Sequence, residues 1–480
     1  MSKFFIPVLL YTLALFIFTS YGAAINEKSS KKYSAINAQM IVQGYEWGPA
    51  VPKVIVQFDD KVSGFDKDTF VLITADVPRD IISVYNSDKN GKKKHSATKY
   101  LAFELEVGTA YVDVIDASFG VANPFIYDAV SGLNSWATDF ELNLSLAENK
   151  TFKVGNVKYG KDKEWTPYTK NLMENYVIPE TEEWKRDVFH PTNANFTLTR
   201  ASFAPKGVKT DFVKNPLIIW LHGAGEGGDD QDIVLLGNEV TALSKDKIQS
   251  YFRIGRQKGA YVLIVQTPTM WMDKGDGTYN DDIVGEKQYS MYQDALFEAI
   301  QDYVKHNKDI DTKKIYVGGC SNGGYMTMNL MFEHGDYFAA YYPICEAYMN
   351  INVSDEMIES VKDYNIWFSQ SEDDATVNPL QTTVPSFYRL IKAGAENVHF
   401  TYYNGIYGQD DPGAKYFGHY AWVYAFNDDV KKEFDNEKVL EDFDNVTFKN
   451  GTVTSTDNYV TSANCNKEAN MWTWLAAQHK

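Results

Sequence analysis

Cysteine is scarce in this chain of 480 residues, which contains only Cys320, Cys345 and Cys465. So few cysteines exclude a disulfide scaffold, which depends on several bridges in a short chain. A single disulfide is possible. We expect it between Cys345 and Cys465, because Cys320 lies in a tight turn described below. The fold must therefore depend on hydrophobic cores, and 44% hydrophobic residues over this length predict two packed domains.

Net positive charge is also lacking, since 64 acidic residues outnumber 46 basic ones and give a net charge of −18. Nucleic acids and anionic membranes attract basic surfaces, so we expect neither as a partner. No His, Cys and Asp residues stand at metal-ligand spacing, and the glycine-rich stretch 223–228 lacks the Gly-Lys-Ser/Thr ending of a phosphate loop. We therefore expect no metal and no cofactor.

Long apolar runs are missing after the first residues. A short positive start, the apolar stretch 4–21 and the small residues Gly22 to Ala24 indicate a secretory signal peptide over 1–24, with a retained membrane anchor as the alternative. After its removal we expect a secreted, extracellular protein without a membrane contact. Asn-x-Ser/Thr sequons agree with secretion because they would be glycosylated at the surface in a eukaryotic host. They lie at Asn143, Asn149, Asn195, Asn352, Asn445 and Asn450.

Residues 36–160 predict an all-β sandwich of the immunoglobulin type. Short β-branched and aromatic runs, several alternating apolar with polar, are separated by turn residues such as Asn90-Gly91. No set of catalytic side chains occurs here. The polar stretch 161–195, rich in Lys, Glu, Thr and Pro, is interpreted as a linker.

Residues 196–480 predict a different architecture. Continuous apolar strands at 216–222 and 260–266 are typical of strands buried on both faces of a parallel sheet. They alternate with amphipathic helical stretches such as 289–307. This alternation predicts an α/β domain with a mainly parallel sheet and helices on both faces.

The stretch 314–333 carries the central motif of that domain. An apolar strand leads into Gly319-x-Ser321-x-Gly323, and apolar residues then recur at helical spacing. A strand, a sharp turn and a helix form a nucleophile elbow, which exposes the serine hydroxyl at the end of the sheet. Both flanking glycines are needed because side chains there would collide with the neighbouring strand and helix. We therefore expect Ser321 to be a nucleophile.

An acid and a histidine should follow the elbow in chain order. Asp374 comes just after the apolar strand 366–371 and is our choice of acid, with Asp373 second. His419 follows the next strand, 398–403, and a loop. Its expected role is that of a general base whose tautomer the acid holds.

An oxyanion hole completes the expected site. The small residues after the strand 216–222 allow backbone N–H groups to point at a developing oxyanion. We assign one donor to Ala224, with a contribution from Gly223, and the other to Asn322, the residue after the nucleophile. His222 is interpreted as a loop-shaping residue. Trp271 and Trp422 are candidate pocket walls, with ordinary core packing as the alternative.

Together these motifs resemble those of secreted esterases related to polyhydroxybutyrate depolymerase and to the "predicted peptidase" group. The resemblance rests on the stretch 222–226, the elbow, Asp374-x-x-Val377 and Gly418-His419-x-x-Trp422. The stretch 42–50 resembles the immunoglobulin-like domain fused to one esterase branch of that group. One departure is the acidic segment 429–468, which looks inserted before the closing helix 470–478.

These observations predict a secreted serine carboxylesterase that hydrolyses short-chain or carbohydrate or phenolic esters through an acyl-enzyme. The expected partner is a small-molecule or polysaccharide-linked ester. Two alternatives stay open, namely a serine peptidase of the same fold and a non-catalytic glycan-binding protein on a hydrolase scaffold. The β-domain could bind polysaccharide, pack over the mouth of the active site or mediate homo-oligomer formation, and the sequence does not separate these roles.

Overall fold

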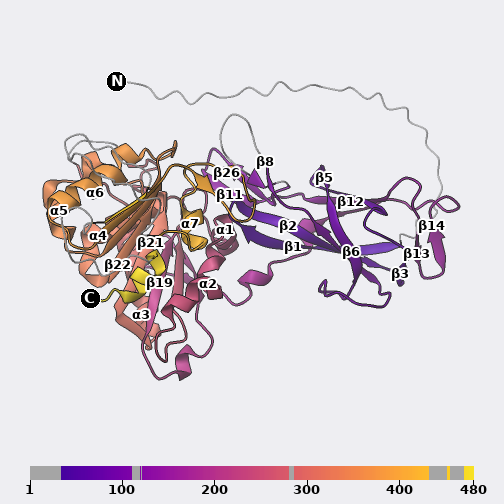
Figure 1. Ribbon diagram of the computed structural model, residues 1–480, viewed down its shortest axis with the longest axis horizontal. Helices are drawn as coiled ribbons and strands as arrows, with labels where there is room; N and C mark the ends of the chain where they lie inside the picture. Colours follow the sequence, from indigo (N-terminus) through magenta and orange to yellow (C-terminus); the bar gives the residue numbers. More distant parts are fainter. Residues whose placement is uncertain (1–33, 111–118, 121, 281–285, 432–450, 455–469) are drawn as a thin grey trace.

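The computed structural model describes residues 34–110, 119–120, 122–280, 286–431, 451–454 and 470–480. The predicted signal peptide, Asn445, Asn450, Cys465 and most of the segment 429–468 lie outside these residues. Two domains lie side by side along the longest axis (Figure 1), and the β-domain is drawn in indigo and purple. Among the described residues, no helix combines the length and the apolar character that crossing a membrane requires.

The N-terminal domain is an all-β immunoglobulin-like sandwich, as predicted. Its main sheets have five and four strands, and a smaller three-stranded sheet and two hairpins complete it. Phe70, Leu72, Phe103 and Leu144 are among the side chains that form its core. The five-stranded sheet has the order β16 (Tyr176–Val177), β1 (Ala35–Tyr45), β2 (Gly48–Phe58), β7 (Tyr100–Leu105), β6 (Ile81–Ser87). The four-stranded sheet has the order β15 (Tyr168–Asn171), β12 (Glu141–Leu146), β4 (Phe70–Thr74), β5 (Val77–Arg79). The remaining strands are β14 (Val157–Tyr159), β13 (Phe152–Val154), β3 (Val62–Ser63), β10 (Phe125–Asp128), β11 (Leu133–Trp136), β8 (Thr109–Ala110) and β9 (Phe119–Gly120).

The segment 161–195 is not the linker that its polar composition suggested. Two strands from this segment belong to the sandwich: β15 pairs with β12 in the four-stranded sheet, and β16 pairs with β1 in the five-stranded sheet. The strand β17 (Lys185–Phe189) pairs with β18 (Leu198–Phe203) of the second domain. Edge strands tolerate polar and charged side chains because one side of the strand faces solvent. The polar composition of this segment therefore gave no sign of its strands, which pair with strands of both domains.

The second domain is an α/β-hydrolase fold, as predicted, built on a nine-stranded sheet. The strands from β20 to β24 run parallel, whereas β17, β18 and β27 pair in antiparallel fashion at the two edges. Strand β27 lies within the segment 429–468, so part of that segment extends the sheet. The order is β17, β18, β20 (Tyr261–Gln266), β19 (Asn215–Leu221), β21 (Ile310–Cys320), β22 (Ala340–Ile344), β23 (Ile366–Ser371), β24 (Val398–Tyr403), β27 (Gly451–Thr454).

Helices flank this sheet. The stretch 240–256 forms short helical turns rather than one continuous helix, and a helix begins earlier, where the Asp230 side chain caps its first turn. The helices are α1 (Gln231–Gly237), α2 (Asp246–Gln249), α3 (Gln293–His306), α4 (Asn322–His334), α5 (Asp355–Val361), α6 (Thr383–Lys392), α7 (Trp422–Phe426) and α9 (Met471–Ala477). Short 3₁₀ turns are η1 (Leu172–Glu174), η2 (Pro179–Thr181), η3 (Val208–Thr210), η4 (Val240–Ser244), η5 (Ser250–Phe252), η6 (Gly335–Tyr337), η7 (Asn350–Asn352) and η8 (Pro379–Gln381), and β25 (Ile406–Tyr407) pairs with β26 (Lys415–Tyr416).

Both faces of the hydrolase sheet are buried. Along β19, Leu217, Ile219 and Leu221 join one hydrophobic cluster, while Ile218 and Trp220 join another. Alternate residues of a strand point to opposite faces, so a strand buried on both faces must be apolar throughout. This requirement explains the unbroken apolar run that predicted the strand.

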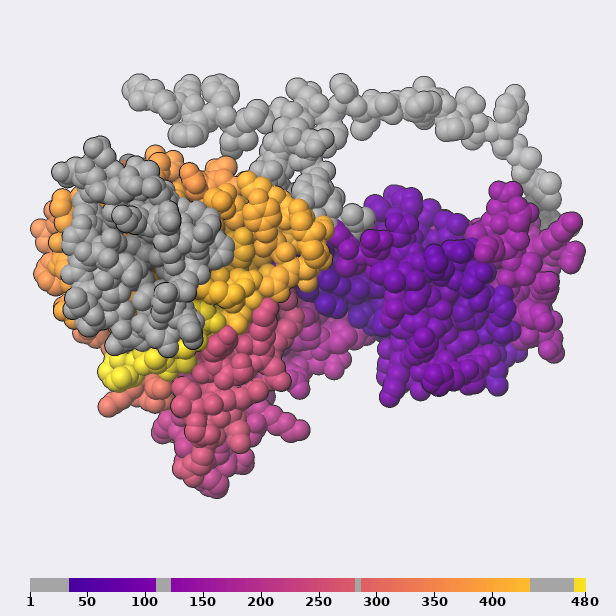
Figure 2. All heavy atoms as spheres, viewed as in Figure 1, coloured from indigo at the N-terminus to yellow at the C-terminus, as the bar shows by residue number. Residues whose placement is uncertain are grey.

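Helix α1 belongs to the cores of both domains. Ile233 and Leu236 pack into the cluster of the β-domain, whereas Val234 and Leu235 pack into a cluster of the hydrolase domain. Figure 1 shows α1, α7, β11 and β26 at the junction. In Figure 2, gold-orange atoms adjoin purple atoms where the two lobes meet. The domains thus share a packed interface.

Candidate active site

Ser321 stands at the strained turn between β21 and α4. Its φ of 55° and ψ of −117° lie outside the regions that most L-residues adopt. A Cβ at Gly319 would meet the Leu221 carbonyl oxygen at 2.4 Å, and one at Gly323 would meet it at 2.0 Å. Both glycines are therefore required by the close approach of β19, as the elbow motif predicted.

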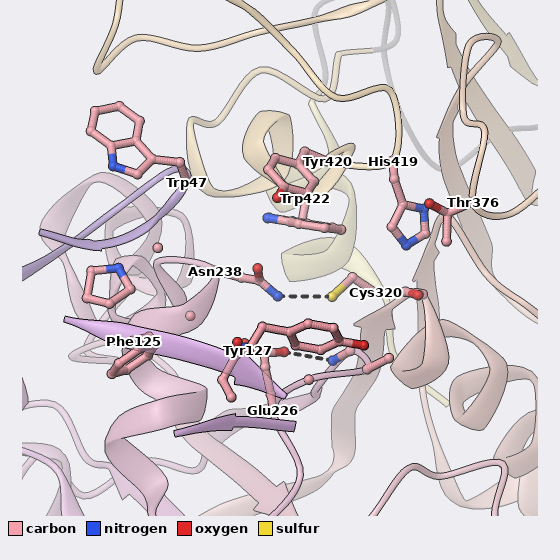
Figure 3. A pocket seen from close by; sticks show the side chains of 18 of the residues that line it. Trp47, Phe125, Tyr127, Glu226, Asn238, Cys320, Thr376, His419, Tyr420 and Trp422 are labelled. Atoms are coloured by element: carbon pink, nitrogen blue, oxygen red, sulfur yellow. Dashed lines mark hydrogen bonds between the residues drawn. The ribbon is translucent and has the colours of Figure 1, made fainter. Parts of the chain in front are cut away.

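His419 and Asp374 are in direct contact. The Nδ1 atom of His419 lies 2.8 Å from Oδ2 of Asp374. The other carboxylate oxygen of Asp374 accepts hydrogen bonds from the N–H groups of Thr376 and Val377, both at 2.9 Å. With Nδ1 engaged by the acid, Nε2 is left to act on a substrate or on Ser321. Figure 3 shows one ring nitrogen of His419 turned toward the centre of the pocket.

Asp373, the second choice of acid, points elsewhere. Its carboxylate accepts a hydrogen bond from the Ser371 hydroxyl and forms an ion pair with Lys415, each at 2.5 Å. A Cβ at Gly418 would meet the Asp373 carbonyl oxygen at 2.4 Å. Asp373 therefore shapes the loop that carries His419, and Asp374 is the residue that touches the imidazole.

Of the two donors expected in the loop after β19, Gly223 and Ala224, only Ala224 is available. The Gly223 N–H donates to Oε2 of the buried Glu226 at 2.8 Å, so it is not available to an oxyanion. The expected contribution of Gly223 is thus wrong. Among the described residues, the N–H groups of Ala224 and Asn322 have no hydrogen-bond acceptor. Asn322 is the first residue of α4, where helical N–H groups lack an intrahelical partner and the helix dipole favours negative charge.

Glu226 holds the loop as a neutral acid. Burial raises its pKa from the ordinary 4.5 to about 8. Its Oε1 atom has no hydrogen-bond partner within the described structure. A protonated carboxyl group still accepts the Gly223 N–H through its carbonyl oxygen. The sequence analysis missed this role, although Glu226 lies in the motif it singled out.

His222 is a loop-shaping residue rather than a second base. Its Nδ1 lies 2.8 Å from the Gly223 carbonyl oxygen, and Nε2 accepts the Thr267 N–H at 3.2 Å. Burial lowers the pKa of His222 to about 4, which keeps the ring neutral. These contacts agree with the role expected from the sequence.

Trp271 does not line the pocket, contrary to one of the two interpretations of this residue. It is fully buried, and its indole N–H donates to the His222 carbonyl oxygen at 3.1 Å. Its backbone N–H donates to the Asn322 side chain at 2.6 Å. Trp271 thus braces the start of α4 from the core. Trp422, the other candidate, does line the pocket and packs edge to face against His419.

A pocket of about 270 Å³ opens between the two domains. Ser321, His419, Ala224 and Trp422 line its hydrolase side. The β-domain supplies the facing wall (Figure 3), which consists of Trp47, Gly48, Pro49, Asn123, Phe125, Tyr127 and Asn134. These wall residues come from the β1–β2 turn and the start of β2, from the loop before β10, and from the β10–β11 hairpin. The sequence analysis did not identify them because nothing local marks a side chain as facing another domain.

The β10–β11 hairpin also contacts the oxyanion loop directly. The Asn134 N–H donates to the Gly225 carbonyl oxygen at 2.6 Å, next to a bridge between Leu133 and Gly225. The Trp136 indole N–H donates to Asp230, which caps α1, at 2.9 Å. Of the three roles left open for the β-domain, packing at the mouth of the pocket is the one that these contacts display.

The structure agrees with some of the expectations for the cysteines and the glycosylation sequons and disagrees with others. Cys345 is a free, buried thiol, so the expected bridge with Cys465 is not seen. Burial also raises the pKa of the Cys320 thiol, which suppresses its nucleophilic form.

Asn352 is 2% exposed and its side chain donates to the Glu286 carbonyl oxygen, so it does not suit glycosylation. Asn149 and Asn195 are exposed, and Asn143 is half-buried.

Two family models match parts of the chain. Residues 37–165 match the esterase Ig-like N-terminal domain, and residues 273–379 match the prolyl oligopeptidase family. The second match includes Ser321 and Asp374 and ends before His419. No curated protein matches the chain.

One of three similar solved structures shares the fold over most of the chain. A structure described as a thermostable esterase has a TM-score of 0.57 at 20% identity, covering 81% of this chain and 96% of that one. A ferulic acid esterase has a TM-score of 0.35 at 14% identity, covering 51% and 93%. An acylaminoacyl peptidase from Pyrococcus horikoshii has a TM-score of 0.31 at 12% identity, covering 73% and 49%. The TM-scores of the last two are below 0.5, so neither supports a conclusion about this chain.

Fold and family matches together define the class, and the chain is a serine hydrolase of the α/β-hydrolase fold. Its catalytic domain is preceded by an immunoglobulin-like domain of the kind that the family model describes in esterases.

Proposed function

We propose that this protein is a secreted carboxylesterase with Ser321 as nucleophile, His419 as general base and Asp374 as the acid that orients it. The observation that carries this proposal is the 2.8 Å contact between His419 and Asp374, which lies beside a pocket that Ser321 also lines. Nucleophile, base and orienting acid in this chain order are typical of acyl transfer on this fold.

In the proposed reaction, Ser321 Oγ forms a bond to the ester carbonyl carbon while its proton passes to Nε2 of His419. The carbonyl oxygen becomes an oxyanion that the N–H groups of Ala224 and Asn322 stabilise. Collapse breaks the bond to the alcohol oxygen, and the imidazolium returns the proton to the departing alcohol. Water then attacks the acyl-enzyme with the same base and releases the carboxylic acid.

The pocket supports a compact substrate group. Its volume of about 270 Å³ lies just below the usual range for small-molecule sites, roughly 300 to 1,000 Å³. Such a space suits a short acyl chain or a single ring of a phenolic or carbohydrate ester, and not a long fatty acyl chain. Aromatic walls such as Tyr127 and Trp422 provide flat surfaces for a ring.

A second candidate is a serine peptidase of the same fold. The match of residues 273–379 to the prolyl oligopeptidase family favours it, since the same machinery cleaves amides. Comparable kcat/KM values on matched ester and anilide substrates would select the peptidase. A preference for the ester by several orders of magnitude would select the esterase.

The experiment that tests the proposal is hydrolysis of p-nitrophenyl esters from acetate to decanoate, together with methyl ferulate and acetylated xylan. Ser321→Ala is the control. We expect turnover that is highest on short or aromatic esters and vanishes in the variant. Absence of turnover by the folded wild-type protein, or unchanged turnover in Ser321→Ala, would refute the esterase.

A further inference from the structure

A buried carboxylate of the β-domain has no part in the steps above. Glu46 occupies the turn between β1 and β2, and only 2% of its surface is exposed. It lies beside Trp47, which lines the pocket and packs edge to face against Tyr416 of the hydrolase domain. A buried carboxylate is costly unless hydrogen bonds satisfy it, so its partners indicate what it holds.

Among the described residues, every hydrogen bond to the Glu46 carboxylate comes from the hydrolase domain. One oxygen accepts the Gln409 N–H at 2.8 Å and the side-chain amide of Asn427. The other accepts the Tyr416 hydroxyl at 2.7 Å and the Asp410 N–H at 3.2 Å. These uncharged donors satisfy the carboxylate across the domain junction.

The approach of the two chains is close. A Cβ at Gly408 would meet Glu46 Oε2 at 1.9 Å, so only glycine fits there. The Asp410 carboxylate in turn accepts the Glu46 N–H at 3.2 Å. Burial, followed by the nearby charge of Glu46, raises the pKa of Asp410. The close packing of Gly408 and the interactions of Asp410 therefore place Glu46 against the segment around residue 410.

That segment is the one that carries His419. Residues 404–421 connect β24 to α7 and contain the β25–β26 hairpin. Tyr416 ends the hairpin three residues before His419, and Asn427 follows the last residue of α7. Glu46 therefore contacts this segment both before and after the histidine. On its other side, the segment packs against Asp373 through Gly418.

We propose that Glu46 is a positioning residue, through which the β-domain fixes the 404–427 segment so that His419 stays within reach of Ser321 and Asp374. This inference rests on the proposed esterase mechanism. Hydrogen bonds to a carboxylate are among the stronger ones, and the four donors bring together parts of the segment that the sheet does not hold. A displacement of about 1 Å in a catalytic group lowers the rate by roughly 100-fold.

A second acid at the same junction provides a matched control. Glu180 accepts the N–H of Gly44 and the Thr241 hydroxyl, the latter at 3.1 Å, and lies 3.6 Å from Lys245. None of these partners belongs to the His419 segment. Replacing Glu180 therefore weakens the junction without removing a hydrogen bond to that segment.

The test compares Glu46→Gln with Glu180→Gln on the best p-nitrophenyl ester, with melting temperatures for both. We expect Glu46→Gln to lower kcat by about 10-fold to 100-fold while KM changes by less than about 2-fold, because the pocket walls remain. We expect Glu180→Gln to lower the melting temperature and leave kcat within about 2-fold. Equal kcat values in the two variants would show that Glu46 only stabilises the junction, and would overturn the proposal.

Tyr416→Phe keeps the test decisive if Glu46→Gln does not fold, since it removes a single hydroxyl and retains the ring. We expect kcat to fall by about 3-fold or more, and the double variant to lose less than the product of the single losses because both remove one shared contact. An unchanged kcat in Tyr416→Phe would overturn the proposal. Failure of the esterase itself is a separate outcome, because it would appear as absent wild-type turnover or as turnover that survives in Ser321→Ala.

Discussion

The carboxylate of Asp374 holds Nδ1 of His419 at 2.8 Å, while Asp373, one residue earlier in the chain, pairs with Lys415. Adjacent residues of one acidic turn thus contact the same loop at different points, Lys415 and His419. Hydrogen bonds from two backbone N–H groups fix the orientation of the buried Asp374 carboxylate. The observed geometry selects Asp374 as the residue that contacts His419.

Asp374→Asn should therefore reduce kcat far more than Asp373→Asn. The amide cannot hold the imidazole in the working tautomer or stabilise the imidazolium, so we expect a loss of about 10³-fold to 10⁴-fold. Asp373→Asn removes an ion pair that is partly exposed and should cost less than about 10-fold. Steady-state kinetics of both variants on one ester measures the difference. The reverse order would move the acid to Asp373.

Ser321→Ala should lower kcat by at least about 10³-fold. The fold should stay intact, because the substitution removes only the hydroxyl group. A fluorophosphonate probe should label the wild-type protein and not the variant. Near-ultraviolet circular dichroism checks the fold. Labelling that persists in the variant would place the reactive nucleophile elsewhere.

Glu226 should make the protein less stable as the pH rises. Its pKa is about 8 when folded and near the ordinary 4.5 when unfolded. Between these values the folded protein keeps a proton that the unfolded chain has released, so the free energy of unfolding falls as the pH rises through this window. A shift of this size corresponds to at most about 5 kcal/mol.

Urea denaturation at pH 5.5, 7 and 8.5 measures this dependence. Glu226→Gln should show a smaller loss of stability over the same range, because its amide does not titrate. The buried Glu346, whose pKa burial also raises to about 8, remains in the variant and contributes equally to both proteins. Parallel slopes in wild type and variant would exclude Glu226 as the source.

Tyr127→Ala should raise KM for bulky or aromatic esters more than for p-nitrophenyl acetate. The ring lines the pocket from the β-domain and is half-exposed, so its removal widens the pocket without opening a core cavity. We expect an increase in KM of about 5-fold to 20-fold for methyl ferulate, equivalent to about 1 to 2 kcal/mol of lost aromatic contact. Tyr289→Ala is the control, since Tyr289 is also exposed and lies away from the pocket. Identical KM values in both variants would remove Tyr127 from the substrate wall.

Much of the fold and of the site followed from the sequence, because the signals are local. The apolar run of β19 marks a strand buried on both faces, and the two glycines around Ser321 mark a turn that admits no side chain. Chain order then limited the partners of Ser321 to the residues after β23 and β24. These features depend on backbone sterics and on hydrophobic pattern, which a sequence displays directly.

Tertiary structure decided what depends on the direction of a side chain or on contacts between distant segments. In the folded protein Asp374 rather than Asp373 points toward His419, and the Gly223 N–H donates a hydrogen bond to Glu226. It placed Trp271 in the core. It also built strands from the polar segment 161–195 and set Glu46 of the β-domain against the loop of His419, more than 350 residues away. Such pairings follow from how whole domains pack, and no neighbouring residue in the sequence records them.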